Sequence, residues 1–227
     1  MNKKLFLPYL NALIRASSLF GKFLLVTILT NGAKLEIVAN YNYIQTVLSF
    51  AIILSGFEVY NIVNRELIRG EQVNIGAEFT IFTLGYCASV IIIVLLIIDL
   101  GIPLIWLMLL LICEHMSQEI FRKLVVLQNQ LKASIVLFSR SGLWAYIASI
   151  GIYFEYFDLN LTDIVAIWLV SSIASILIGI MFLNSETIGR VYLRSFSLIG
   201  IHQLTLRLLK TSALYLIIGV VSRLPLL

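Results

Sequence analysis

The sequence predicts an all-α membrane protein: a bundle of six complete transmembrane helices followed by the start of a seventh. Two observations support this prediction. Hydrophobic residues make up 60% of the chain and charged residues only 12%, whereas a soluble domain has roughly 25% charged residues. The hydrophobic residues also gather in runs that match a bilayer core of about 30 Å, which takes about 20 helical residues to cross. The short alternating segments of a membrane β-barrel do not occur in the sequence.

Polar residues, or Gly and Pro, separate the predicted spans, as is typical of helix ends. Examples are Thr30-Asn31-Gly32 and Asp99-Leu100-Gly101, the latter followed by Pro103. The predicted spans cover residues 7–30, 37–63, 76–98, 102–128, 133–157 and 162–184. We interpret the chain as a six-helix transmembrane lobe (1–184), a basic amphipathic cytoplasmic connector (185–208) and the truncated start of a seventh transmembrane helix (209–227).

The distribution of Lys and Arg predicts the orientation, because basic residues near helix ends stay on the cytoplasmic side of a membrane. With the N-terminus inside, 11 of the loop Lys and Arg fall on the cytoplasmic side and Lys34 alone on the outside. The net charge of +4 is therefore interpreted as a topological bias, and no nucleic-acid partner is expected.

Neither cysteine nor histidine predicts a cofactor or metal site. Cys87 and Cys113 fall inside spans without metal-ligand spacing, so they are expected to be small core residues. On the fourth span, polar residues that include a His and a Glu four apart suggest a metal or proton-relay set, but the sequence offers no third ligand. These residues are expected near the cytoplasmic end, paired with Arg122 or Lys123; they are Glu114, His115, Gln118 and Glu119.

The first span has a polar stripe with two positive charges. Its members are spaced by four, three and four residues, which places them on one helix face. An ionisable group at membrane depth is costly and normally faces a cavity or a partner. We therefore predict that the stripe lines a cavity; the alternative is that its two basic residues reach opposite membrane interfaces. The stripe consists of Asn11, Arg15, Ser18 and Lys22.

Two further spans carry charged residues at depth. Glu58 and Asn61 lie on the second span, and Glu58 either lines the cavity or forms a structural ion pair with Arg15 or Arg140. On the fifth span Arg140 and Trp144 are one turn apart. We predict that both line the cavity, and the alternative is a pair that anchors the helix at the interface.

Small residues at four-residue spacing predict close helix packing in lipid. One such ladder lies on the fifth span and one on the sixth, and neither is expected to have a functional role. They are Ser141, Ala145 and Ser149, and Ser171, Ser175 and Gly179.

Four segments together resemble a known family, the Wzx-type O-antigen flippases of the multidrug/oligosaccharidyl-lipid/polysaccharide exporter superfamily. The resemblance is a pattern of spacing and hydropathy over essentially the whole chain, and no single motif is specific. The segments are Leu19-Phe20-Gly21-Lys22, Tyr41 to Gly56 leading to Asn64-Arg65-Glu66, Glu114-His115-Met116-Ser117-Gln118-Glu119 with Arg122, and Arg140-Ser141-Gly142-Leu143-Trp144.

The resemblance implies a carrier in the bacterial inner membrane that moves an undecaprenyl-pyrophosphate-linked oligosaccharide by alternating access. Arg15, Lys22 and Arg140 would offset the phosphate charge, with Glu58 as carrier of a coupling proton or cation. Sugar contacts would come from Asn11, Ser18, Asn61 and Trp144. Family members have two lobes, so the resemblance implies that this chain is the N-terminal half, inactive alone or completed by a second lobe or chain.

Other functions are weighed against this one. A multidrug exporter of the same superfamily would be expected to have an acidic or aromatic pocket before a cationic one. A small multi-spanning scaffold subunit explains the hydropathy but gives Arg15 and Arg140 no purpose. An enzyme is not expected, because the sequence has no nucleophile elbow, Asp-rich metal motif or phosphate-binding Gly loop.

Cysteine labelling tests the predicted topology. The new thiols of Lys34→Cys and Asp158→Cys should react with a membrane-impermeant maleimide in intact cells, because both positions lie in predicted outer loops. Those of Arg69→Cys and Lys132→Cys should react only after the membrane is opened. Labelling of the Arg69→Cys variant from outside would overturn the whole arrangement.

Overall fold

The computed structural model describes residues 3–32, 35–56, 75–97, 100–154 and 160–183. The chain divides into two compact units, and the boundary between them falls inside one helix. The first unit comprises residues 1–44 and 99–182, and the second comprises residues 45–98 and 183–227.

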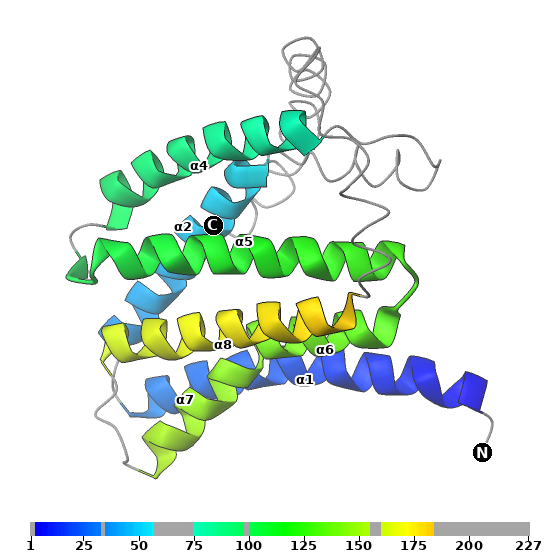
Figure 1. Cartoon of the computed structure of the whole chain (residues 1–227). Coiled ribbons are helices and arrows are strands. Elements are labelled where there is room, and N and C mark those ends of the chain that lie inside the picture. Colours follow the sequence, from blue (N-terminus) through cyan, green and yellow to red (C-terminus); the bar gives the residue numbers. More distant parts are fainter. Residues whose placement is uncertain (1–2, 33–34, 57–74, 98–99, 155–159, 184–227) are drawn as a thin grey trace. The chain divides into compact units, whose positions relative to one another are not determined.

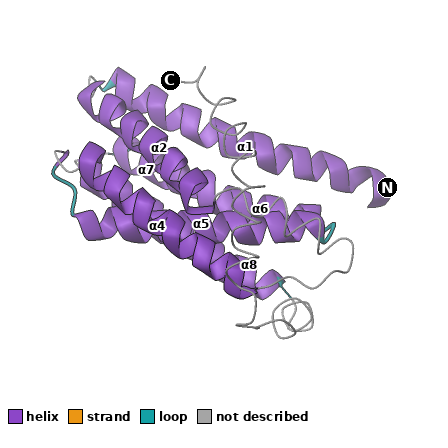
Figure 2. Cartoon of the chain, turned by 90° about the horizontal axis from the view of Figure 1, so that it is seen from above, coloured by secondary structure: helices purple, strands orange, loops and turns teal. Residues whose placement is uncertain are grey.

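Every regular element among the described residues is an α-helix (Figures 1 and 2). The helices are α1 (Lys3–Asn31), α2 (Leu35–Gly56), α4 (Ile75–Ile97), α5 (Leu104–Val126), α6 (Gln130–Ser141), α7 (Leu143–Tyr153) and α8 (Leu161–Phe182). With α6 and α7 taken together as one span, six are long and apolar enough to cross a membrane. The chain is therefore an all-α, multi-pass membrane protein, as the sequence predicts.

The predicted spans agree with these helices to within a few residues at the ends that the structure describes, with one exception. The fifth span, predicted as one helix, is divided at Gly142 into α6 and α7. Gly142 has φ −109° and ψ −46°, outside the narrow range of a regular helix. The connector at 185–208, the start of the seventh helix at 209–227 and the end of the second span lie outside the described residues.

The break at Gly142 lies where α1 crosses the α6–α7 span. A Cβ on Gly142 would come 2.9 Å from the Cα of Ser18, and one on Gly21 would come 3.2 Å from the carbonyl oxygen of Gly142. Glycine on both sides thus lets the two backbones touch, as small residues do between transmembrane helices. The Tyr146 hydroxyl bridges the same crossing, because it donates to the Ser17 carbonyl at 3.0 Å.

A tight turn joins α5 to α6 and makes the two helices neighbours. Asn129 N–H donates to the Leu124 carbonyl at 2.9 Å and Gln128 N–H to the Val125 carbonyl at 3.0 Å. This pair of bonds is the Schellman motif, with Gln128 at φ 60° in the left-handed position that glycine usually takes. At the start of α8, Asn160 and Asp163 each accept a hydrogen bond from the other's backbone N–H, which caps the helix.

The serine ladder of α8 packs against α5 and α6, which confirms the predicted packing role on that helix. Ser171 donates to the Ser139 carbonyl. Ser175 donates to the Val136 carbonyl at 3.0 Å and shares a 2.5 Å hydrogen bond with Ser117 of α5. A Cβ on Gly179 would collide with the Ile120 side chain, so α5 and α8 approach closely there.

The second unit has its own close helix contact, between the end of α2 and α4. Ser89 donates to the Ala51 carbonyl at 2.7 Å, and its hydroxyl lies 3.0 Å from that of Ser55. A Cβ on Gly85 would collide with the Ser55 carbonyl. Small residues at this crossing again replace bulky ones.

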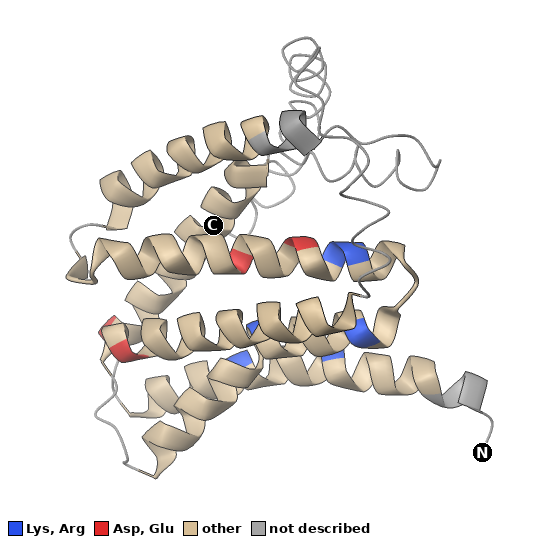
Figure 3. Cartoon of the chain, in the orientation of Figure 1, with Lys and Arg blue, Asp and Glu red and all other residues tan. Residues whose placement is uncertain are grey.

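At the helix ends named below, basic and acidic residues lie on opposite sides of the first unit (Figure 3). Arg122 and Lys123 lie in the last turns of α5 and Lys132 in the first turn of α6, beside the α5–α6 turn. Acidic residues lie instead in the first turns of α2 and α8, namely Glu36 and Asp163. Nearer the middle of the spans lie Arg15 and Lys22 of α1, Glu114 and Glu119 of α5, and Arg140 at the end of α6.

The α1 crossing is tested by Gly142→Ala. The new Cβ would lie 2.9 Å from Ser18 Cα, so α1 must shift, and overpacking of this kind costs about 1–3 kcal/mol. Thermal unfolding of the purified variant in detergent should show this loss of stability as a lower melting temperature. The control is Gly32→Ala, whose Cβ would lie 3.4 Å from the Ile28 carbonyl, an ordinary contact. Equal melting temperatures for the two variants would contradict the close crossing.

Candidate functional site

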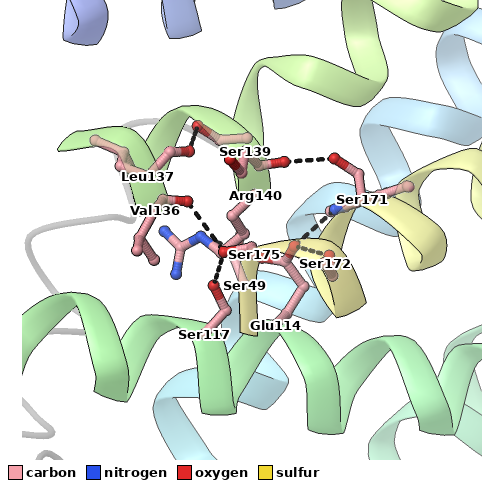
Figure 4. A network of polar contacts seen from close by, with 12 residues as sticks. Ser49, Glu114, Ser117, Val136, Leu137, Ser139, Arg140, Ser171, Ser172 and Ser175 are labelled. Carbon is pink, nitrogen blue, oxygen red and sulfur yellow. Dashed lines mark hydrogen bonds and ion pairs between the residues drawn. The ribbon is translucent and has the colours of Figure 1, made fainter. Parts of the chain in front are cut away.

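The candidate site of the first unit is centred on the carboxyl group of Glu114. This residue lies near the middle of α5 and is 7% exposed. Its Oε1 atom accepts two hydrogen bonds from α8, at 2.8 Å from the indole Nε1 of Trp168 and at 2.6 Å from the hydroxyl of Ser172. Figure 4 shows Glu114 reaching from α5 toward the polar residues of α6 and α8.

Arg140 on α6 is the basic partner of Glu114. Its Nε lies 3.7 Å from Oε2 of Glu114, an ion pair beyond hydrogen-bond distance. The Nε and Nη1 atoms are buried and have no hydrogen-bond partner within the described part of the chain. Donors buried in this way cost free energy until an acceptor satisfies them.

Lys22 on α1 is a second basic group at this site, because it interacts electrostatically with both Glu114 and Arg140. Two basic side chains lie near one carboxyl group here, so basic groups outnumber acidic groups in the cluster. Glu114, Arg140 and Lys22 come from three different helices, so the cluster exists only when these helices are packed.

Aromatic rings enclose one side of the cluster. Trp144 of α7 stacks on Trp168 of α8, with ring centroids 5.2 Å apart and planes 14° apart. Tyr41 of α2 meets Trp144 edge-on at 5.6 Å and Trp168 at 6.3 Å. Trp144 is fully buried, and its Nε1 has no hydrogen-bond partner among the described residues.

The predicted polar stripe of α1 faces α6 over part of its length. Arg15 Nε donates to the Ser134 hydroxyl at 3.0 Å, and that hydroxyl donates to the side-chain oxygen of Asn11. Ser18 is buried and bonds within its own helix, to the Ile14 carbonyl. The Arg15 residue is exposed, whereas Lys22 belongs to the Glu114 cluster.

The structure thus brings Lys22, Arg140 and Trp144 into one cluster and places Asn11, Arg15 and Ser18 along the helix that supplies Lys22. Glu58 and Asn61 lie outside the described residues. The alternative interpretation of Arg140 and Trp144 as an interfacial anchor pair is wrong, because Trp144 is buried in a ring stack.

The prediction for Glu114 is wrong. Glu114 lies mid-helix beside Arg140, and not near the cytoplasmic end with Arg122 or Lys123 as its partner. The prediction holds for Glu119, whose Oε1 lies 2.6 Å from Nη1 of Arg122. The sequence does contain a signal for the burial of Glu114. On a helical wheel Glu114 shares one face of α5 with residues that are buried, namely Leu107, Leu110, Leu111 and Ser117.

Chemically, the site can bind an anion or carry a proton. Buried, unpartnered N–H groups of Arg140 and Trp144 can donate to an anionic or carbonyl oxygen, and the Glu114 carboxyl can gain or lose a proton. Among the described residues, no three or more His, Cys, Asp or Glu side chains lie together in a way that could hold a metal ion.

Comparison with known proteins does not place the chain in a family. A scan against protein-family models and searches of the curated proteins and of the solved structures found no match.

The pairing of Glu114 with Arg140 is tested by a mutant cycle. Arg140→Met leaves the Glu114 carboxylate buried without its basic partner, which costs about 3–5 kcal/mol. The double variant Glu114→Gln/Arg140→Met should lose less, since the neutral amide still accepts hydrogen bonds from Trp168 and Ser172. Chemical unfolding in detergent micelles measures the free energy of unfolding of both variants.

The control for this cycle is Lys132→Met on the same helix, where the ammonium lies 5.7 Å from the centroid of the Phe182 ring. It should cost no more than about 1 kcal/mol. An equal loss in the Arg140→Met variant and in the double variant would show that Glu114 and Arg140 are not coupled.

Proposed function

We propose that this chain belongs to a lipid-linked oligosaccharide flippase, a carrier that moves an undecaprenyl-pyrophosphate-linked O-antigen unit across the bacterial inner membrane by alternating access. The observation that supports the proposal is the cluster of Lys22, Glu114 and Arg140, in which Glu114 is buried and Arg140 keeps unpartnered N–H donors among the described residues. Ionisable groups at membrane depth are expensive and usually mark a transport pathway.

The excess of basic over acidic groups favours an anionic cargo. A pyrophosphate that leaves bulk water needs cations and hydrogen-bond donors, and the guanidinium of Arg140 offers both in a geometry that fits phosphate oxygens. Lys22 adds a second positive charge to the same place. In this proposal Arg15 and Asn11, which are linked through Ser134, contact the headgroup on its way along α1.

Aromatic and hydroxyl groups suit the sugar part of the cargo. The ring stack of Trp144 and Trp168 offers flat apolar faces beside the Glu114 carboxyl, and Ser18 of α1 adds a hydroxyl. Trp144 is fully buried in this conformation, so sugar contact requires the helices around it to separate. Such opening is expected of a carrier in which one bundle moves against another.

The same basic groups argue against the other candidate functions. A multidrug exporter that carries organic cations would place an acidic group in its pathway without an excess of positive charge beside it. A scaffold subunit has no use for a buried charged cluster, which well-packed hydrophobic residues could replace without loss of stability.

The orientation and the assembly are parts of the proposal. The basic residues beside the α5–α6 turn support the proposal that this turn and the N-terminus lie on the cytoplasmic side of the inner membrane. A second lobe or chain would complete the transport pathway. Glu58 and Asn61 remain proposed pathway residues, with Glu58 as a carrier of coupling protons or cations.

Substitutions in the native gene of the source bacterium test the cationic pathway. Arg15→Ala and Arg140→Ala should abolish surface polysaccharide although the protein still inserts, because the phosphate loses its cation in a low-dielectric setting. Arg15→Lys and Arg140→Lys should keep part of the export, since charge remains but the two-pronged geometry is lost. Surface polysaccharide per inserted molecule, from quantitative immunoblots of membranes, is the measurement.

Lys132→Ala is the control, a basic residue of α6 outside the cluster, and it should export normally. The proposal fails if the two alanine variants lower the amount of inserted protein while export per molecule stays unchanged, because Arg15 and Arg140 would then be structural residues only.

A further inference from the structure

We infer that Glu114 competes with the anionic cargo for Arg140, so that binding of a pyrophosphate group is linked to the uptake of one proton by the Glu114 carboxyl. This inference rests on the proposed function, since it concerns the same arginine.

The carboxyl group is anchored on the side away from Arg140. Oε1 of Glu114 accepts hydrogen bonds of 2.8 and 2.6 Å from Trp168 and Ser172, whereas Oε2 lies 3.7 Å from Arg140 Nε. Glu114 is thus held by α8, and its interaction with Arg140 on α6 is electrostatic without a hydrogen bond. Arg140 can be released without loss of the bonds between Glu114 and α8.

Arg140 still lacks acceptors for its buried donors. Its Nε and Nη1 have no hydrogen-bond partner among the described residues, and neither has Nε1 of Trp144, four residues further along. Trp144 stacks on Trp168, which itself donates to Glu114, so Trp144 and Arg140 are both linked to the Glu114 carboxyl group. An oxygen-rich anion would accept hydrogen bonds from them, which the Glu114 carboxylate, 3.7 Å from Arg140 Nε, does not.

An anion bound to Arg140 would be repelled by the negative charge of the Glu114 carboxylate. A phosphate oxygen bound to Arg140 would lie close to a carboxylate in a low-dielectric interior, where like charges repel strongly. A proton taken from water onto the carboxyl removes this repulsion and leaves Oε1 able to accept from Trp168 and Ser172. When the anion leaves, the proton returns to water and the carboxylate pairs with Arg140 again.

Charged and titratable groups surround Glu114 from each helix packed around it. They are Lys22 on α1, Tyr41 on α2, Cys113 on α5 itself and Arg140 on α6, with neutral Trp168 and Ser172 on α8; Arg122 acts on Arg140 from the end of α5. Glu114 is the acidic member of this set that lies against Arg140. It is therefore the group whose protonation changes the competition.

The test measures the affinity of the purified full chain, in detergent, for farnesyl pyrophosphate by titration calorimetry from mildly acidic to mildly alkaline pH. Inorganic pyrophosphate and farnesol are titrated in parallel, to separate the headgroup from the isoprenoid tail. Three proteins are compared: the unaltered chain, Glu114→Gln and the control Glu119→Gln, a neighbouring buried carboxyl paired with Arg122. Because pyrophosphate itself titrates, the diagnostic quantity is the ratio of each protein's Kd to that of Glu114→Gln at the same pH.

The expected Kd ratio of the unaltered chain to Glu114→Gln is near one at acidic pH and rises to about tenfold at alkaline pH. A tenfold ratio corresponds to an Arg140 that is free of Glu114 in about a tenth of the molecules. Glu119→Gln should behave like the unaltered chain. Farnesol should show no dependence of its Kd on Glu114, whereas both pyrophosphate compounds should.

Proton exchange gives a second measurement. Cations make a bound pyrophosphate release protons, so calorimetry in buffers of different ionisation enthalpy is carried out on both the unaltered chain and Glu114→Gln. On binding of farnesyl pyrophosphate at alkaline pH, the unaltered chain should take up more protons, or release fewer, than the variant.

A Kd ratio of one at every pH, or equal proton exchange by the unaltered chain and Glu114→Gln, would overturn the role of Glu114 and leave the proposed flippase function intact. Failure of both the unaltered chain and the Glu114→Gln variant to bind either pyrophosphate compound would overturn the inference together with the anionic cargo on which it rests.

Discussion

The first unit of this protein depends on how it accommodates one carboxyl group inside an apolar helix bundle. Glu114 accepts hydrogen bonds from Trp168 and Ser172 of α8 and faces Arg140 of α6. A charged group at such depth is tolerated only with partners, so α5, α6 and α8 must keep their register. The serine ladder of α8 holds that register with hydrogen bonds to backbone carbonyls of α6.

Close packing of α1 makes the cluster possible. Gly21 and Gly142 let the two backbones touch, and Lys22, the next residue along α1, is thereby brought to Glu114 and Arg140. A side chain at either glycine would push the lysine away from its counter-charge. The local backbone at a crossing thus determines the electrostatics of the site, although neither glycine carries a functional group.

Hydropathy alone predicted the helices, because a membrane requires long apolar runs with internally satisfied backbones. The small-residue ladder of α8 was predictable for a similar reason: four-residue spacing marks one face of a helix. The partner of Glu114 was not predictable, because Arg140 lies on another helix and sequence spacing says nothing about which helices are neighbours. Spacing along the sequence suggests the nearest basic residues of α5 as partners, which is correct for Glu119 and wrong for Glu114.

The break within the fifth span could not be predicted from the sequence either. A single glycine is common in transmembrane helices, and Ser141-Gly142 on its own gives no reason to end a helix there. The cause lies in the approach of α1, whose Ser18 backbone occupies the space beside Gly142. Tertiary contact therefore decided a local conformation that the surrounding apolar sequence left open.

The tight turn between α5 and α6 has a consequence for how the protein enters the membrane. The two helices form a hairpin, and by helical rise Glu114 and Arg140 lie at nearly matched depths, about 18 and about 15 Å from the ends that the turn joins. Inserted alone, each helix would bring an uncompensated charge to its centre, at about 2.5–3.5 kcal/mol. Inserted together, the hairpin carries an acid and a base that neutralise one another before any other helix arrives. The short turn thus lets Glu114 and Arg140 enter the membrane together, in one biosynthetic step.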